Sequence, residues 1–225
     1  MDYRAEAEKA GEKLMGYYKD TDWKVSKVSQ EVSAGNFEKE VTVSHKKSAE
    51  FDGHIYKAEC VLDGTPDEIV KYVIPTPLGV REKWDKTIKS SEVLESSEKD
   101  FFVVHSQTHS SAMGVISSRD FIDAVLINHL DEDNIVCTNS VSVEHPQCPP
   151  VDDVVRAFNH PGGTFCVPVK GEENKTKVIN FLQSDLKGML PRTLVETALP
   201  NTMIDFIIGL KTALDNKILH EPAED

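Results

Sequence analysis

Two histidines with the spacing of a helical metal site are the first residues to consider for chemistry. His105 and His109 are four positions apart, and on a helix that spacing places two imidazoles on one face, where they can share a metal ion. The surrounding residues 100 to 110 are predicted to form a strand, on which the two positions lie about 13 Å apart. The sequence therefore predicts no metal site here.

Other reactive residue types lack the partners that catalysis requires. Asp120 follows Arg119 at the start of a predicted strand, where we expect a structural ion pair, and a catalytic aspartate would need an activated partner. Gly162 and Gly163 do not belong to a G-x-x-x-x-G-K-[ST] phosphate-binding frame, and the sequence contains no G-x-S-x-G motif. We expect no catalytic residue and no cofactor.

Size and charge narrow the class of protein further. The chain has 225 residues and a formal net charge of −13, so one domain with one substantial core is expected. Nucleic acid is not an expected partner, because binding to phosphates requires clustered Lys and Arg. Contact with an anionic membrane must be local and transient, made by a small apolar tip or a few lysines.

The N-terminus and the cysteines predict a cytoplasmic protein. Residues 1 to 6 are charged and lack the apolar run of a signal peptide, and no stretch is long enough to span a bilayer. The four cysteines include no C-x-x-C pair, which favours thiols in a reducing compartment over a zinc site or a disulfide scaffold. Any association with membranes is expected to be peripheral and transient.

Hydrophobic periodicity predicts three helices and a series of strands. The opening helix is expected over residues 3 to 18 and an apolar stripe predicts a terminal helix over 191 to 219, which Pro200 can kink. Residues 65 to 68, Thr-Pro-Asp-Glu, provide an N-cap, a first-turn proline and two acids, so a helix is expected over 66 to 73. Strands are expected over residues 23–28, 41–45, 54–62, 86–94, 100–110, 119–130, 135–143, 155–169 with a break at 161–163, and 175–185.

Four segments that occur in this order resemble motifs of the steroidogenic-acute-regulatory-protein-related lipid transfer (START) family. They are Lys83-Trp84-Asp85, ISSRDFID at 116–123, VRAFNHPGGTFCVP at 155–168 and SDLKGMLP at 184–191. The resemblance covers residues 3 to 219 and is greatest to the small, soluble, single-domain members. It implies an α+β helix-grip fold, in which a curved antiparallel sheet of about nine strands surrounds a long C-terminal helix and encloses an apolar cavity.

The resemblance also implies how the chain is divided. A single domain is expected over residues 1 to 220, followed by a short acidic tail at 221 to 225 that is expected to be disordered. Residues 29 to 40 are longer than the corresponding hairpin of the family and are expected to form an exposed loop away from the cavity.

Positions that match cavity-lining positions of the family fall on the sheet and on the terminal helix. On the sheet side they are Ile88, His160 and Leu186, and on the helix they are Leu199, Thr202, Phe206 and Leu210; Met203 of the same apolar stripe is a further candidate. Two alternatives remain open from the residues themselves. The helical stripe can be plain core that covers the sheet, and His160 can be a buried histidine whose ring bonds to the backbone.

The polar part of the implied cavity departs from the cholesterol-carrying members. Those members place a buried acid and an arginine against the sterol hydroxyl, and the corresponding positions here are Ser106 and Val125. An uncharged polar end is therefore expected, which favours a bile-acid-like or oxysterol ligand over cholesterol. Arg81 is a candidate partner for a ligand carboxylate; the alternative is an exposed, solvated arginine.

The loop around residues 110 to 116 corresponds to the omega loop of the family, beside the lid helix. Its residues Ala112, Met113, Val115 and Ile116 are candidates for a gate that dips into a bilayer. The alternative is an ordinary hairpin with these apolar side chains tucked underneath.

The leading hypothesis is therefore a monomeric carrier that holds one sterol-like or bile-acid-like lipid and exchanges it with membranes. An enzyme that uses the same cavity, such as an acyl-CoA thioesterase or a cyclase, is the alternative from a different class, because the fold alone does not determine function. A ligand sensor is the third possibility.

Overall fold

The computed structural model describes residues 1–30, 40–75, 79–97, 99–110, 112–130, 133–152 and 154–220. The centre of the predicted loop at 29–40 and the acidic tail at 221–225 lie outside these residues. The three predicted helices are present, and each predicted strand segment contains strand, although the segments 155–169 and 175–185 are each divided into shorter strands.

The elements follow one another as an opening helix, a sheet interrupted by short helices, and a terminal helix. The helices of the described residues are α1 (Tyr3–Lys19), α2 (Pro66–Val73), α3 (Arg192–Asp215) and the short 3-10 helices η1 (Arg81–Lys83), η2 (Ala112–Gly114) and η3 (Ile218–His220). The strands are β1 (Lys24–Gln30), β2 (Glu40–Lys47), β3 (His54–Asp63), β4 (Ile88–Ser97), β5 (Phe101–Thr108), β6 (Arg119–Leu130), β7 (Ile135–Ser142), β8 (Val155–Arg156), β9 (Phe158–Asn159), β10 (Gly163–Pro168), β11 (Lys175–Leu182) and β12 (Ser184–Asp185).

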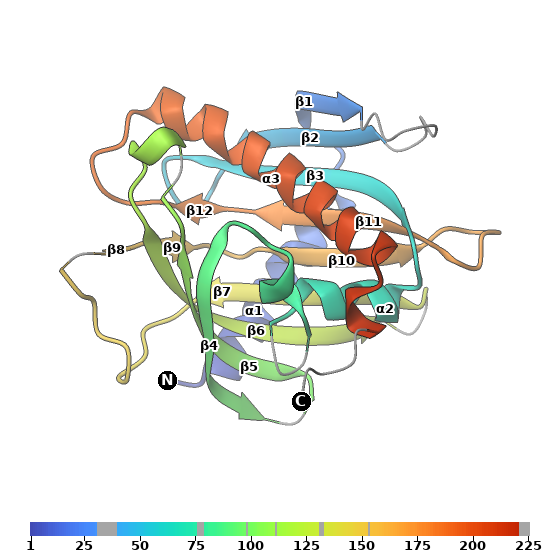
Figure 1. The fold of residues 1–225 in the computed structure, drawn as a ribbon, viewed down its shortest axis with the longest axis horizontal. Coiled ribbons are helices and arrows are strands. Elements are labelled where there is room, and N and C mark those ends of the chain that lie inside the picture. The colour runs from blue at the N-terminus through green and yellow to red at the C-terminus, as the bar shows by residue number, and fades with distance from the viewer. Residues whose placement is uncertain are drawn as a thin grey trace.

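One large sheet carries the fold. Within the described residues its strand order is β1-β2-β3-β11-β10-β7-β6-β5-β4, with β8 added in parallel to β6. Figure 1 shows that α3 crosses one face of the curved sheet while α1 lies behind the other. The expected helix-grip architecture, with about nine strands around a C-terminal helix, is confirmed.

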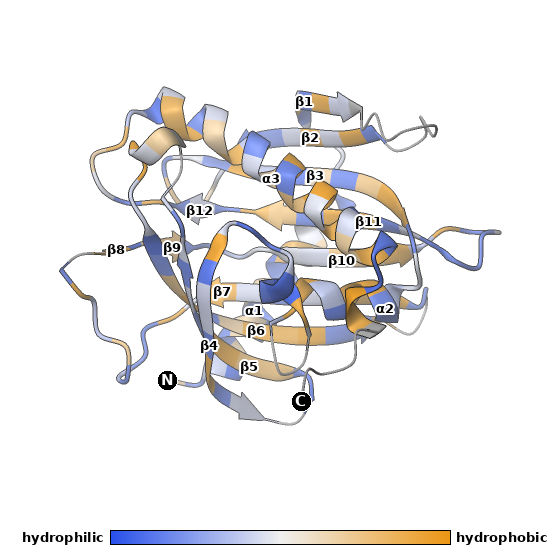
Figure 2. Ribbon diagram, in the orientation of Figure 1, coloured by the Kyte–Doolittle hydropathy of each residue, from blue (hydrophilic) through white to orange (hydrophobic). Residues whose placement is uncertain are grey.

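Alternation along the strands separates the two faces. On β3, Tyr56, Ala58 and Leu62 join the core beneath α3, while Ile55 points to the other side and packs with Leu14 of α1. The side chains of a strand point to opposite faces in turn, so one strand can serve both layers. Figure 2 shows the long hydrophobic stretches of β5 and β6, in contrast to the hydrophilic hairpin that joins β10 to β11.

The helix α2 has the bounds that its capping residues predict. The Thr65 side chain accepts a hydrogen bond from the backbone N–H of Glu68, and Pro66 occupies the first turn. Its buried side chains, which include Ile69 and Tyr72, join the core beneath α3.

Trp84 connects α2 and α3. Its indole Nε1 donates to the backbone oxygen of Tyr72 at 2.9 Å, and its ring lies 5.4 Å from that of Phe206. A Cβ atom added at Gly209 would meet the indole at 3.1 Å. The glycine therefore lets α3 approach the indole closely, and the Lys83-Trp84-Asp85 motif fixes the helix on the sheet.

The predicted strand over 155–169 is divided into three pieces. β8 pairs with β6, β9 pairs with β12, and only β10 continues in the main sheet beside β11 and β7. The chain turns at 160–162, and position 163 requires glycine, since φ there is +156 and an added Cβ would lie 1.9 Å from the backbone oxygen of Thr138. This close approach places β9 beside β7 and β12.

We expect Gly163→Ala to lower the free energy of unfolding by at least about 2 kcal/mol more than Gly171→Ala does. Both glycines have positive φ, but the Cβ of residue 171 would meet nothing within 4 Å. The difference therefore contains the clash with Thr138, which only the Gly163 variant has, and the difference between the two backbone angles. Urea unfolding of the two variants measures the difference, and equal midpoints would contradict the close packing at Gly163.

Candidate functional site

A cavity of about 470 Å³ lies between the sheet and the first half of α3. Its volume falls in the range of about 300–1,000 Å³ that is usual for small-molecule sites. Most of its wall is apolar. The apolar lining residues are Val73, Ile74, Ile88, Phe102, Val104, Ile116, Phe121, Val125, Phe181, Leu182, Leu186, Ala198, Leu199, Met203 and Phe206.

Ten of the eleven ligand-site candidates from the sequence lie on this wall. They are Arg81, Ile88, Ser106, Val125, His160, Leu186, Leu199, Thr202, Met203 and Phe206. Their contact with a ligand stays a prediction. The eleventh candidate, Leu210, does not line the cavity, in contrast to the prediction. Its side chain is fully buried in the core. It lies one turn beyond Phe206, where α3 already packs closely on the sheet.

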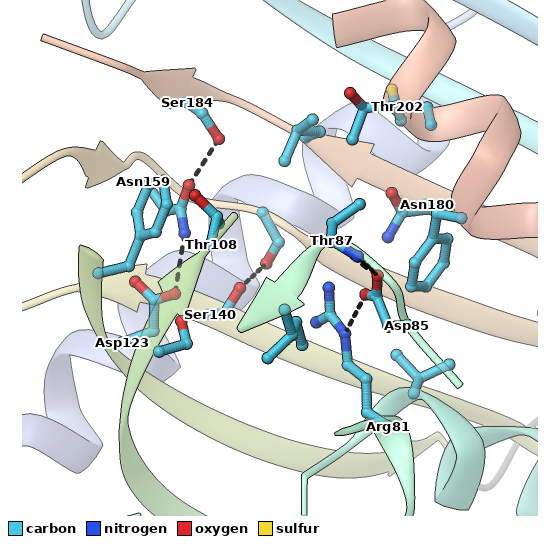
Figure 3. A pocket seen from close by; sticks show the side chains of 18 of the residues that line it. Arg81, Asp85, Thr87, Thr108, Asp123, Ser140, Asn159, Asn180, Ser184 and Thr202 are labelled. Atoms are coloured by element: carbon cyan, nitrogen blue, oxygen red, sulfur yellow. Dashed lines mark hydrogen bonds and ion pairs between the residues drawn. The ribbon is translucent and has the colours of Figure 1, made fainter. Parts of the chain in front are cut away.

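The polar part of the cavity is built around Asp123 of β6. Its two carboxylate oxygens accept hydrogen bonds from Ser142 Oγ at 2.7 Å and Asn159 Nδ2 at 2.8 Å. Asn159 Oδ1 in turn accepts from Ser184 Oγ at 2.6 Å (Figure 3). This chain joins β6, β7, β9 and β12, so it fixes the positions of four polar groups at one side of the cavity.

Opposing effects act on the pKa of the Asp123 carboxyl. Burial raises the pKa of its carboxyl, while the hydrogen bonds from Ser142 and Asn159 and the positive charge of Arg81 oppose that rise without cancelling it. A buried carboxyl that takes up a proton becomes a hydrogen-bond donor as well as an acceptor. It can therefore bind a ligand hydroxyl as donor or acceptor, and a ligand carbonyl oxygen only as donor.

The polar end of the cavity contains more than Ser106 and Val125. Ser106 and Val125 do line the cavity, but an ionisable group lies two positions before Val125. The signal was present in the sequence: Phe121, Asp123 and Val125 share one face of a strand, so the acid interrupts an apolar inward face. Asn159, the hydrogen-bond partner of Asp123, could not be predicted from the sequence, because it comes from a distant segment of the chain.

A second polar group lies across the cavity from Asp123. Arg81 Nε donates to Asp85 Oδ2 at 3.0 Å, and the hydroxyl of Thr87 donates to Asp85 Oδ1 at 2.6 Å (Figure 3). Burial alone would raise the pKa of Asp85, but the charge of Arg81 and the bonds from Thr87 outweigh it, and the pKa is lowered. Asp85 is therefore a buried carboxylate that holds the arginine at the cavity.

Arg81 is not the solvated surface arginine of the alternative interpretation. Its side chain is about a third exposed, at 36%, and its guanidinium carbon lies 5.2 Å from the centre of the Phe206 ring. A cation over an aromatic face is attracted by it. Asp85 and Phe206 thus hold a positive charge at the edge of an otherwise apolar space.

His160 is held by aromatic rings. Its imidazole stacks on Phe51 at 4.7 Å and 9°, and Phe158 lies 4.9 Å away on a tilted plane. Burial lowers its pKa, so the ring is predominantly neutral near pH 7. These contacts fix a neutral ring in the cavity wall.

Arg119 and Asp120 do not pair with each other, which corrects the expected ion pair. Adjacent strand residues point to opposite faces. Asp120 instead binds Arg156 at 2.8 Å and His105 at 3.0 Å. The guanidinium of Arg119 donates to backbone oxygens of Ser117 and Leu186. Both residues are buried and structural.

The loop from 112 to 116 is divided between surface and interior. Met113 is fully exposed and Val115 is 63% exposed, but Ile116 is only 4% exposed and lines the cavity. Ile116 therefore follows the alternative interpretation, in which its side chain is tucked under the loop. Ala112 belongs to η2 by its backbone, and its side chain lies outside the described part of the structure.

Within the described residues there is no group of three or more His, Cys, Asp or Glu side chains arranged to hold a metal ion. His105 is bound to Asp120, while His109 lines the cavity. Among the described helices none combines the length and hydrophobicity needed to cross a bilayer.

A curved antiparallel sheet and a C-terminal helix that enclose a mostly apolar cavity define a domain that holds a small molecule in its interior. The chain belongs to the START family: the model of the START domain matches residues 4–218. It is 39% identical over 210 residues to mouse StAR-related lipid transfer protein 5, covering 93% of this chain and 94% of the relative. It is 33% identical over 215 residues to human StAR-related lipid transfer protein 6, covering 95% and 92%.

Solved structures agree with this assignment. Human StAR-related lipid transfer protein 5 superimposes with a TM-score of 0.83 at 35% identity, covering 97% of this chain and 98% of that one. The structure of human STARD10 has a TM-score of 0.70 at 19% identity, which shows a common fold.

We expect Asp123→Asn and Asp120→Asn to change the pH dependence of stability in opposite directions. Because the pKa of Asp123 is raised above 3.8 on folding, wild type loses stability relative to Asp123→Asn as the pH rises from about that value through the folded pKa. The pKa of Asp120 is lowered, so its stabilising contribution is present above pH 3.8 and is lost as the pH falls through the folded pKa.

Urea unfolding of the three proteins across the acidic range measures both effects. The difference between wild type and each variant removes the contribution of the other titrating groups. If the two differences in free energy of unfolding change with pH in the same direction, the prediction that burial raises the pKa of Asp123 is wrong.

Proposed function

We propose that this chain is a carrier that holds one sterol-like lipid in the cavity and exchanges it with membranes. The observation that supports the proposal is a cavity of about 470 Å³ whose lining is more apolar than polar and includes the polar groups Arg81 and Asp123. Membership of the START family and the lipid transfer named for the relatives favour the same function.

The energetics of such a cavity suit a carrier that must also unload. A sterol-sized ligand has about 28 non-hydrogen atoms, and a binding free energy of about −0.3 kcal/mol per atom gives about −8 kcal/mol. That corresponds to a dissociation constant of roughly 1 μM. A complex of this strength forms readily and still releases its ligand to a membrane.

The two polar groups favour a ligand that carries two polar groups. Arg81 can bind a carboxylate, and Asp123 can donate to or accept from a hydroxyl across the cavity. A bile acid has both groups. An oxysterol has hydroxyls for both places, whereas cholesterol has one hydroxyl and leaves one group without a ligand partner. We therefore infer the order bile acid, oxysterol, cholesterol.

We propose binding without catalysis. In the part of the chain that the structure describes, the hydroxyls of the lining residues Ser140 and Ser184 donate to Gly162 and Asn159, so neither is paired with a histidine as a serine nucleophile would be. The carrier is proposed to act as a cytoplasmic monomer with transient membrane contact. Its four cysteines are thiols, three of them buried, as suits a reducing compartment.

We expect Ser106→Phe to weaken binding of a fluorescent sterol by about tenfold or more, because the added ring takes up room that the ligand needs. Lys89→Phe is the matched control, since residue 89 is exposed on the neighbouring strand β4. Fluorescence titration measures affinity, and circular dichroism verifies folding. Unchanged affinity in a folded Ser106→Phe variant would place the ligand elsewhere.

We expect Arg81→Gln to weaken binding of cholic acid by about tenfold and of its neutral side-chain alcohol by less than about threefold, because only the acid loses a charge-assisted hydrogen bond. Comparing two ligands on one variant removes any effect of the broken Asp85 pair on stability. Arg81→Lys should restore part of the affinity for the acid. Equal losses of affinity for the acid and the alcohol would show that Arg81 does not bind the carboxylate.

A further inference from the structure

Two loops of the molecule present methionines to solvent in the same way. In the first loop (residues 112–118), Met113 and Gly114 both have positive φ; in the second loop (residues 186–191), Lys187 and Gly188 do. Met113 and Met189 each have a relative exposure of 103%. A left-handed pair of residues makes a sharp turn, so each loop ends in a projecting methionine.

One buried side chain joins the two loops. Arg119 is 3% exposed, and its guanidinium donates to Ser117 Oγ at 2.7 Å in the first loop. On the other side it donates to the backbone oxygens of Leu186 at 3.0 Å and Lys187 at 3.4 Å in the second. An added Cβ at Gly188 would lie 3.4 Å from the same guanidinium. Figure 1 shows η2 beside the start of α3.

Both loops also form part of the cavity wall. Ile116 of the first loop and Leu186 of the second line the cavity, as does Arg119 itself. The exposed methionines therefore lie on the outer side of the segments whose inner side faces the proposed ligand. A surface in this position is adjacent to the contents of the cavity.

Local charge favours a neutral bilayer over an anionic one. The cations near the second loop are already paired: Lys187 with Asp185, and Arg192 with Glu196 and Asp52. The whole chain has a net charge of −13. Apolar insertion, rather than attraction to anionic lipid, must then supply the affinity.

We propose that the first and second loops form a single membrane-contacting tip that inserts Met113 and Met189 together into a zwitterionic bilayer. Arg119 is the positioning residue that keeps the two loops side by side. The proposal rests on the proposed carrier function and adds to it a second loop, from β12 to α3, and the residue that couples both.

The test uses the full chain and phosphatidylcholine vesicles. Met189→Asp is expected to weaken vesicle binding in a flotation assay by about tenfold, as is Met113→Asp, since each removes an apolar side chain from the bilayer and adds a charge. Val151→Asp, a change of a 57% exposed valine outside both loops, is expected to leave binding unchanged. The rate of dehydroergosterol transfer between vesicles should fall in parallel.

Arg119→Lys tests the coupling, because a lysine cannot reach the oxygens of both loops as a guanidinium does. Because Arg119 also lines the cavity, binding of dehydroergosterol without vesicles is measured alongside, and we expect the rate of transfer between vesicles to fall by a larger factor than the affinity. If the Arg119→Lys variant fails to fold, the Met189→Asp variant still tests whether the second loop contacts the membrane. Wild-type binding and transfer by Met189→Asp would overturn the proposal, as would vesicle binding that requires added phosphatidylserine or is absent in wild type. Failure of wild type to bind dehydroergosterol or cholic acid without vesicles would instead count against the carrier function.

Discussion

The fit of Trp84 against the second half of α3 is the contact on which the rest of the structure depends. The indole is fixed by its hydrogen bond to Tyr72 and meets Phe206 and Gly209 at close range. From Ile207 onward, Ile207, Leu210 and Ala213 are buried in the core. Before it, Leu199, Thr202 and Met203 face the cavity. One helix therefore serves as core along one half and as cavity wall along the other.

The polar groups of the cavity are tolerated because each has a partner. No buried side-chain nitrogen or oxygen in the described residues lacks a hydrogen bond, and an unpaired one would cost about 1–3 kcal/mol. Asp85 remains charged beside Arg81, whereas burial favours the neutral form of Asp123. The surroundings thus shift the pKa values of the two acids in opposite directions, downward for Asp85 and upward for Asp123.

Local patterns predicted the elements, and contacts between distant segments decided the site. Thr65 and Pro66 suffice to place α2, and alternation suffices to assign the faces of β3, because both depend on near neighbours in the chain. The partners of Asp123 come from β7 and β9, and those of Arg119 from residues 186 and 187, which no local pattern contains. The positions of Ile116 and Leu210 could not be predicted for a related reason. Whether a loop residue is exposed, and whether a residue of a helical stripe faces a cavity or the core, depends on which distant segment packs against it.

The buried cysteines offer a way to measure how often the strands of the sheet open to solvent. Cys60, Cys137 and Cys166 are at most 5% exposed, on β3, β7 and β10, and burial raises the pKa of Cys137 to about 11. A thiol in this state is alkylated only while its strand is transiently open to solvent, because the reagent must reach it and the thiolate must form. Cys148, which is partly exposed, should be alkylated without such opening and calibrates the reagent. The alkylation rates of the buried thiols therefore report how often the central strands open in the native protein.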